Sequence, residues 1–161
     1  MPKTIARDTY HKYKELTDFE NLIANALKLE NAIKAKLNEG ASAAKSGNFI
    51  ILSSLNDMID IQDGVLLNME NGTMMITNSH SIFNEQTFMM KLDKSRSSIG
   101  KVVKINLKSA MDVKKAAIAM KSNNFTEAYN VLNSIISSRK DVEQFIEGFK
   151  QGLQSLGKIA Q

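Results

Sequence analysis

The chain has 161 residues, of which 43% are hydrophobic, and its formal net charge is +4. It contains no Cys, which excludes disulfides, thiolate metal sites and cysteine nucleophiles. No run approaches the roughly 18 apolar residues of a membrane span, and the first residues lack the apolar segment of a signal peptide. We therefore expect one domain over residues 1–161, located in the cytoplasm or packaged within a virus particle, with no membrane partner.

The first 46 residues predict an arm followed by a long helix. Tyr10 and Tyr13 alternate with basic residues in the arm, and such rings either stack on nucleic-acid bases or pack on a neighbouring element. From Thr17 to Ser46, apolar residues recur at helical spacing until the stop signal at Gly47. Such a helix is about 45 Å long and exceeds the ~26 Å diameter of a compact chain of this size. We expect it to pack on the final helix or on a second subunit.

The middle of the chain, residues 47–108, predicts a short helix followed by a small antiparallel sheet. Residues 49–61 fit a helix or a strand, and the 3.6-residue period favours the helix. Asn71-Gly72 is a typical type I′ turn between two short apolar segments. The predicted strands are Val65–Glu70, Thr73–Thr77, Phe88–Leu92 and Lys101–Leu107, with a basic loop, Lys94–Lys101, before the last of them.

The last third, residues 109–161, predicts three helices that begin with capping boxes. In a capping box, a side chain at the helix start and an acid three residues later satisfy free backbone N–H groups. The pairs are Ser109 with Asp112, Asn124 with Glu127, and Ser138 with Asp141. The fold class that follows is α+β and mainly helical: a long N-terminal helix, a small antiparallel sheet in the middle, and a C-terminal helical hairpin plus a final amphipathic helix.

Residues 119–136, AMKSNNFTEAYNVLNSII, resemble a single tetratricopeptide-type helix turn. Phe125 and Ala128 match its aromatic and small packing positions, whereas Asp112 stands where the repeat has an aromatic residue. No second copy follows, and repeat proteins need several copies to bury a core. The resemblance implies an αα-hairpin and carries no function.

Charge is distributed unevenly along the chain. Residues 46–90 carry five acidic residues and no Lys or Arg, whereas residues 91–121 carry nine basic and two acidic residues. The basic block could neutralise nucleic-acid phosphates, dock on the acidic block within one subunit or between subunits, or be a solvated surface without a role.

No motif predicts catalysis, a cofactor or a small-molecule substrate. His11 and His80 have no ligand partners at metal-binding spacing, so we expect no metal site. The spacing of Asp57, Asp60 and Asp63 is not that of a calcium loop and indicates a solvated acidic helix. The chain has no phosphate-binding glycine loop and no nucleophile elbow. We therefore expect a protein that is not an enzyme.

The function expected from these patterns is a non-enzymatic, self-associating structural protein in a homo-oligomer or larger assembly. Small size, the lack of Cys and Trp, and a composition rich in Lys and Asn suggest a viral or phage component. The candidate oligomer interface is Phe19, Ile23, Ile33, Phe145, Phe149, Gly148, Gly152 and Leu156. The alternative is a nucleic-acid-binding accessory protein that uses the basic stretch 91–121, with the candidate contacts Lys94, Arg96, Lys101, Lys104, Lys108, Tyr10 and Tyr13.

Overall fold

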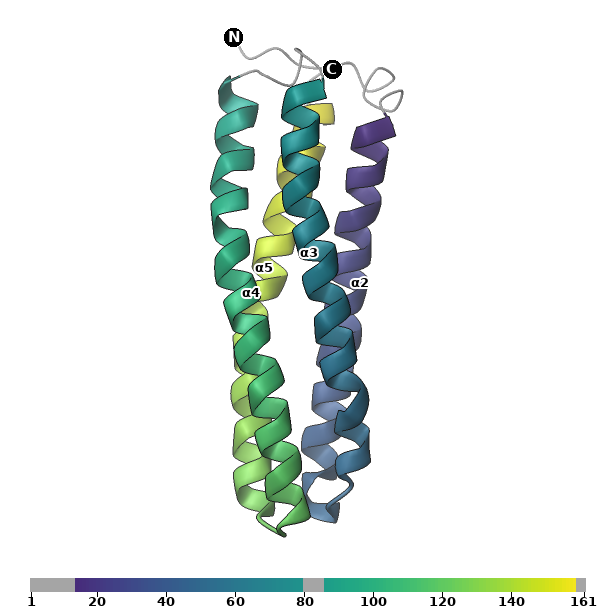
Figure 1. The fold of residues 1–161 in the computed structure, drawn as a ribbon, viewed down its shortest axis with the longest axis vertical. Helices are drawn as coiled ribbons and strands as arrows, with labels where there is room; N and C mark the ends of the chain where they lie inside the picture. Colours follow the sequence, from purple (N-terminus) through teal and green to yellow (C-terminus); the bar gives the residue numbers. More distant parts are fainter. Residues whose placement is uncertain (1–13, 80–85, 159–161) are drawn as a thin grey trace.

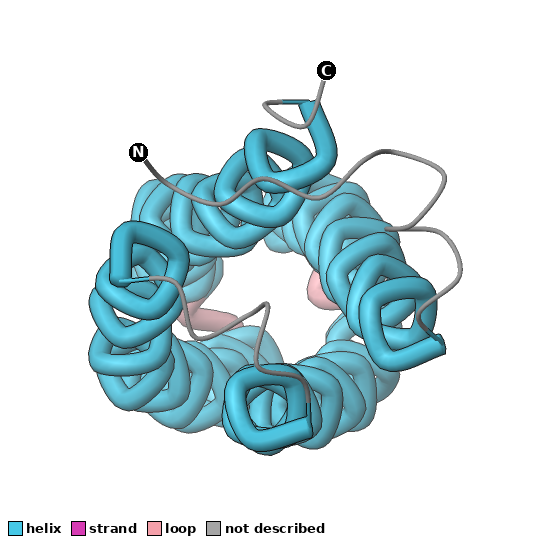
Figure 2. The backbone as a smooth tube through the Cα atoms, turned by 90° about the horizontal axis from the view of Figure 1, so that it is seen from above, coloured by secondary structure: helices cyan, strands magenta, loops and turns pink. Residues whose placement is uncertain are grey.

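The computed structural model describes the backbone of residues 14–79 and 86–158 and the side chains of residues 17–71 and 99–151. The described chain forms four long helices that lie side by side (Figure 1). They are α2 (Lys14–Ala43), α3 (Ser53–Ser79), α4 (Gln86–Lys121) and α5 (Phe125–Lys158). Each helix contacts the two that adjoin it around a ring, and α2 closes the ring against α5 (Figure 2). Neighbouring helices run in opposite directions (Figure 1).

The predicted α+β fold is wrong, because about 95% of the described chain is helical and it contains no strand. The two segments of the expected hairpin and its Asn71-Gly72 turn all belong to α3. Phe88–Leu92, the supposed loop Lys94–Lys101 and the supposed strand Lys101–Leu107 all belong to α4. Local β propensity is a weak preference, and burial on a helical stripe overrides it. In α4 that stripe includes Val102, Asn106 and Ser109.

The first half of the bundle follows the sequence prediction more closely. The long helix expected from Thr17 to Ser46 is confirmed as α2 and a short 3₁₀ turn, η1 (Ala44–Ser46). Gly47 then takes a left-handed conformation with φ of 72°, which glycine adopts without steric cost. The helix favoured for residues 49–61 is also confirmed, although it begins as a 3₁₀ turn, η2 (Phe49–Leu52), before α3.

Of the three capping boxes, only the middle one marks a helix start. The amide of Asn124 donates a hydrogen bond to Glu127 at 2.7 Å, directly before α5, and Asn123 has a φ of 62° in the turn. The predicted αα-hairpin is therefore confirmed as α4, this turn and α5. Helix starts at Ser109 and Ser138 are wrong, because both residues lie inside long helices. The Ser138 hydroxyl donates to the carbonyl of Ile135 at 2.7 Å, which lets a serine sit within a helix.

The core has two apolar parts with a layer of polar side chains between them. The terminal cluster, near the start of α2 and the end of α5, includes Phe19 and Phe149, whose ring centroids are 5.8 Å apart. The expected pairing of the final helix with the first is thus confirmed. The turn cluster, near Gly47 and Asn123, includes Leu37 and Leu132. In each helix the buried residues recur at alternating steps of three and four, as in bundles whose side chains interdigitate.

Candidate interaction surface

Exposed apolar side chains gather on the outer side of α3 and α4, which we call the α3/α4 face. On α4, Leu107, Met111 and Ile118 are 61%, 63% and 64% exposed, and on α3 Leu67 is 50% exposed. Single exposed apolar residues are common, whereas apolar residues that gather into one patch can mark a binding surface.

The edges of the two helices are fixed by contacts inside the bundle. Asp63 accepts a hydrogen bond from Asn106 of α4 at 2.8 Å, so the edge of α3 that carries Asp63 faces α4. Asp60 and Leu67 lie one turn to either side of Asp63 and share that edge. The opposite edge of α4 lines a cleft with α5 at Lys104, Lys108 and Asp112, and Leu107 is exposed on the outer side of α4, away from the buried stripe.

The α3/α4 face carries opposite charges on its two helices. Asp57 and Asp60 are exposed on α3 and Lys114 is exposed on α4, whereas Lys104 lies on the edge of α4 that lines the cleft with α5. The described part of α3 has no basic residue, so this side is acidic along its length. Asp63 lies at the edge of the face, where burial raises the pKa of its carboxyl and the Asn106 hydrogen bond partly lowers it. The acidic and basic blocks of the sequence thus become two adjacent helices.

The candidate nucleic-acid residues fall into three groups. Lys101, Lys104 and Lys108 are exposed on α4, where they lie on a helix surface and not on the outer face of a strand. Lys94 and Arg96 belong to the α4 backbone, and their side chains lie outside the described residues. Tyr10 and Tyr13 also lie outside the described residues.

Most of the candidate oligomer residues pack inside the chain's own bundle. Phe19, Ile23, Ile33 and Phe149 are at most 2% exposed, so neighbouring helices cover them. Phe145 is half-buried and meets Phe149 edge-on, with ring centroids 5.2 Å apart. Gly148 is exposed on α5, where an added Cβ would have nothing within 4 Å. Gly152 and Leu156 belong to the α5 backbone, and nothing further of them is described.

Sequence reasoning missed the polar layer. Each helix contributes to it at a core position: Glu30 from α2, Gln62 from α3, Asn106 from α4 and Arg139 from α5 are all fully buried. Glu30 carries a charge, yet it continues the three-four spacing of buried residues between Ala26 and Ile33. Continuing the three-four spacing of buried positions through each helix, whatever the residue type, would have predicted the layer.

Arg139 satisfies its guanidinium donors within the layer. Its Nε and Nη2 donate to the Glu30 carboxylate, Nη1 donates to Asn106 at 2.7 Å, and Nη2 also donates to Gln62 at 2.8 Å. A longer contact of 3.5 Å joins Nη1 to Ser109. The Gln62 amide in turn donates to Glu30 at 3.0 Å. One positive and one negative charge are thus paired and hydrogen-bonded, which is the condition for burying them at tolerable cost.

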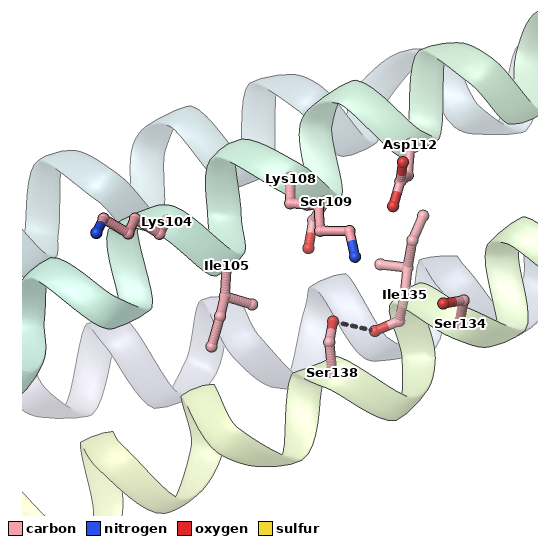
Figure 3. Close-up of a pocket in the computed structure, with 8 residues that line it drawn as sticks. All are labelled: Lys104, Ile105, Lys108, Ser109, Asp112, Ser134, Ile135 and Ser138. Atoms are coloured by element: carbon pink, nitrogen blue, oxygen red, sulfur yellow. Dashed lines mark hydrogen bonds between the residues drawn. The ribbon is translucent and has the colours of Figure 1, made fainter.

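A cleft of about 330 Å³ lies between α4 and α5. Figure 3 shows Ile105 and Ile135 pointing into the space between the two helices, with the Ser138 hydroxyl bonded to the Ile135 carbonyl. Lys108 and Asp112 carry opposite charges at the rim. A second cleft of about 500 Å³ lies between α2 and α5. No hydrogen bond among the described residues pairs a nucleophile with a base in either cleft.

Among the described residues, no cluster of His, Cys, Asp and Glu could hold a metal ion. No helix in that part of the chain combines the length and the apolar character needed to cross a membrane. Comparison of the chain with family models, with curated proteins and with solved structures found no match.

Proposed function

We propose that the chain is a non-enzymatic bundle protein that associates with further copies of itself through the α3/α4 face. The observation that carries this proposal is the row of Leu107, Met111 and Ile118 on α4, exposed although apolar. Burying a fully exposed leucine-sized side chain contributes about 1.5–3 kcal/mol, so the row is a substantial driving force for association. The proposal supplies a surface for the self-association expected from the sequence, and the viral or phage setting stays a prediction.

Charge on the face favours another copy as the partner. The α3 side of the face carries Asp57 and Asp60 and the α4 side carries Lys114, so the two helices have opposite charges. Complementary charges steer association and fix orientation, and they act more weakly as salt rises. We therefore expect an oligomer whose stability falls with ionic strength but which keeps an apolar contribution.

Light scattering across protein concentration tests the proposal, with Leu107→Gln as the disrupting variant. Loss of the central apolar contact should weaken association at least tenfold. Ile61→Gln is the matched control, because Ile61 is similarly exposed, at 57%, on the edge of α3 away from α4. Thermal unfolding of the variants should stay near that of the parent, since neither side chain is in the core. A parent chain that is monomeric at every concentration would rule the proposal out.

Nucleic-acid binding is a second candidate because Lys101, Lys108 and Lys115 are all exposed at seven-residue spacing. This spacing aligns them in one row along α4, roughly 21 Å long. Such a row can follow a phosphate backbone and would give salt-dependent, sequence-independent binding. Replacing all three by Gln should abolish binding of a single-stranded oligonucleotide at low salt and leave light scattering unchanged. A parent chain that fails to bind the oligonucleotide at low salt excludes this candidate.

A further inference from the structure

We infer that two copies of the chain pair with their two-fold axis parallel to the bundle, so that α3 of each copy lies on α4 of the other. This inference rests on the self-association proposed above and specifies its geometry. A symmetric dimer uses the same face twice, so the α3/α4 face must complement itself under the symmetry operation.

Charge decides between the two directions that a two-fold axis within this face can take. An axis perpendicular to the bundle places α3 on α3 and α4 on α4, so the helix with Asp57 and Asp60 lies on its own copy and the helix with Lys114 lies on its own copy. An axis parallel to the bundle places each acidic helix on the basic helix of the other copy. Like charges that are brought together cost several kcal/mol at an interface, so the parallel axis is favoured.

The register of the helices supports the same arrangement. Gln62 and Asp63 of α3 contact Asn106 of α4 in antiparallel helices, so Leu67 lies at the level of Lys101 and Val102, within two residues of Gly100. A parallel axis preserves these levels and brings Leu67 of one copy near Gly100 of the other. Gly100 is exposed, and a Cβ built on it would have nothing within 4 Å, so its backbone leaves room for the leucine. The symmetry repeats this contact.

The same register places Asp60 of one copy at the level of Lys108 and Ser109 of the other, within two residues of Leu107. The acid therefore lies beside the apolar row. The available area is also sufficient. The 27 residues of α3 extend for about 40 Å, and two adjacent helices are roughly 20 Å wide. This gives about 800 Å² per copy, the size of a standard specific interface.

Single-cysteine variants test the geometry cleanly, because the chain has no cysteine of its own. A Leu67→Cys copy labelled with ¹⁵N is mixed with an unlabelled Gly100→Cys copy in a glutathione redox buffer. Non-reducing mass spectrometry then separates mixed disulfides from the two like pairs. The matched control pairs Leu67→Cys with Lys114→Cys, which lies on the same edge of α4 but about 21 Å further along the helix. Light scattering of the mixtures reports association independently.

The expected result is a dimer mass with the mixed Leu67→Cys/Gly100→Cys disulfide in large excess over like pairs and over the control. Disulfides need Cα atoms within roughly 7 Å, so this excess reports direct opposition of the two positions. A dimer mass with Leu67→Cys joined mainly to itself, or with no disulfide, overturns the geometry but leaves self-association standing. A monomer mass without disulfides overturns both.

Discussion

In the polar layer, Glu30 and Arg139 occupy core positions and are fully buried, whereas on the α3/α4 face Leu107 and Met111 are more than half exposed. Both regions depart from the rule that a bundle is apolar inside and polar outside. The layer compensates within the chain, because its polar groups bond to one another. The face has no such compensation within its own chain. The first departure is satisfied within the fold, and the second is the observation on which the proposed self-association rests.

The largest expected effect comes from breaking the polar layer on one side. Arg139→Leu leaves the Glu30 carboxylate buried without its cation and removes the donors to Gln62 and Asn106. We expect a loss of about 3–5 kcal/mol in the free energy of unfolding, the usual cost of an uncompensated buried charge. Urea unfolding followed by circular dichroism measures it. A loss below ~1 kcal/mol would mean that water or a shift of the helices replaces the arginine.

Replacing all four residues of the polar layer by leucine should leave the free energy of unfolding unchanged or raise it. With Glu30, Gln62, Asn106 and Arg139 all changed, no buried charge remains, and such replacements are neutral or stabilise by about 1–4 kcal/mol. Polar core residues fix register in some bundles, so we expect broader NMR resonances and faster hydrogen exchange in this variant. A destabilised variant would contradict the expected change in stability, and parent-like resonances would show that the layer does not fix the register of the helices.

The smallest effect concerns Asp63, which joins the two regions because Asn106 donates to it at the edge of the face. Burial raises the pKa of its carboxyl in the folded state, and the charge of Asp60 raises it further. The folded chain therefore takes up a proton before the unfolded chain does, so this residue costs stability as pH rises through its folded pKa. Asp63→Asn should raise the thermal midpoint of unfolding slightly at neutral pH. It should also reduce the gain in stability that the parent shows as the pH is lowered. An equal pH dependence in parent and variant would contradict this assignment.

The sequence predicted helix boundaries correctly where a strong helix-stop or helix-start signal coincided with a clear helical spacing of apolar residues. Gly47 ended the first helix as expected, and the Asn124–Glu127 pair marked the start of α5. It misled where local signals conflicted with tertiary packing. Asn71-Gly72 is a favoured turn pair, yet it lies within α3, because Leu66 and Met69 continue the buried stripe of that helix.

The same conflict explains the candidate sites. Apolar residues such as Phe19 and Ile33 were assigned to an oligomer interface because the long first helix exceeds the diameter of a compact chain of this size. Two further long helices, α3 and α4, cover these residues inside the chain. The basic residues of α4 were recognised from composition alone, but their position beside an acidic helix depends on the bundle and could not be deduced from spacing.

The turn at Asn123 and the contact between α2 and α5 together make the bundle cyclic. Every helix adjoins its neighbours in sequence, and the first described helix also adjoins the last. The start of α2 and the end of α5 lie at the same end of the molecule (Figure 1). The fold therefore has no unique point at which its helices must begin. A circular permutant that is opened at the α4–α5 turn and joined at the other end of the bundle would preserve each helix pair. The bundle therefore does not depend on the order in which its helices are synthesised.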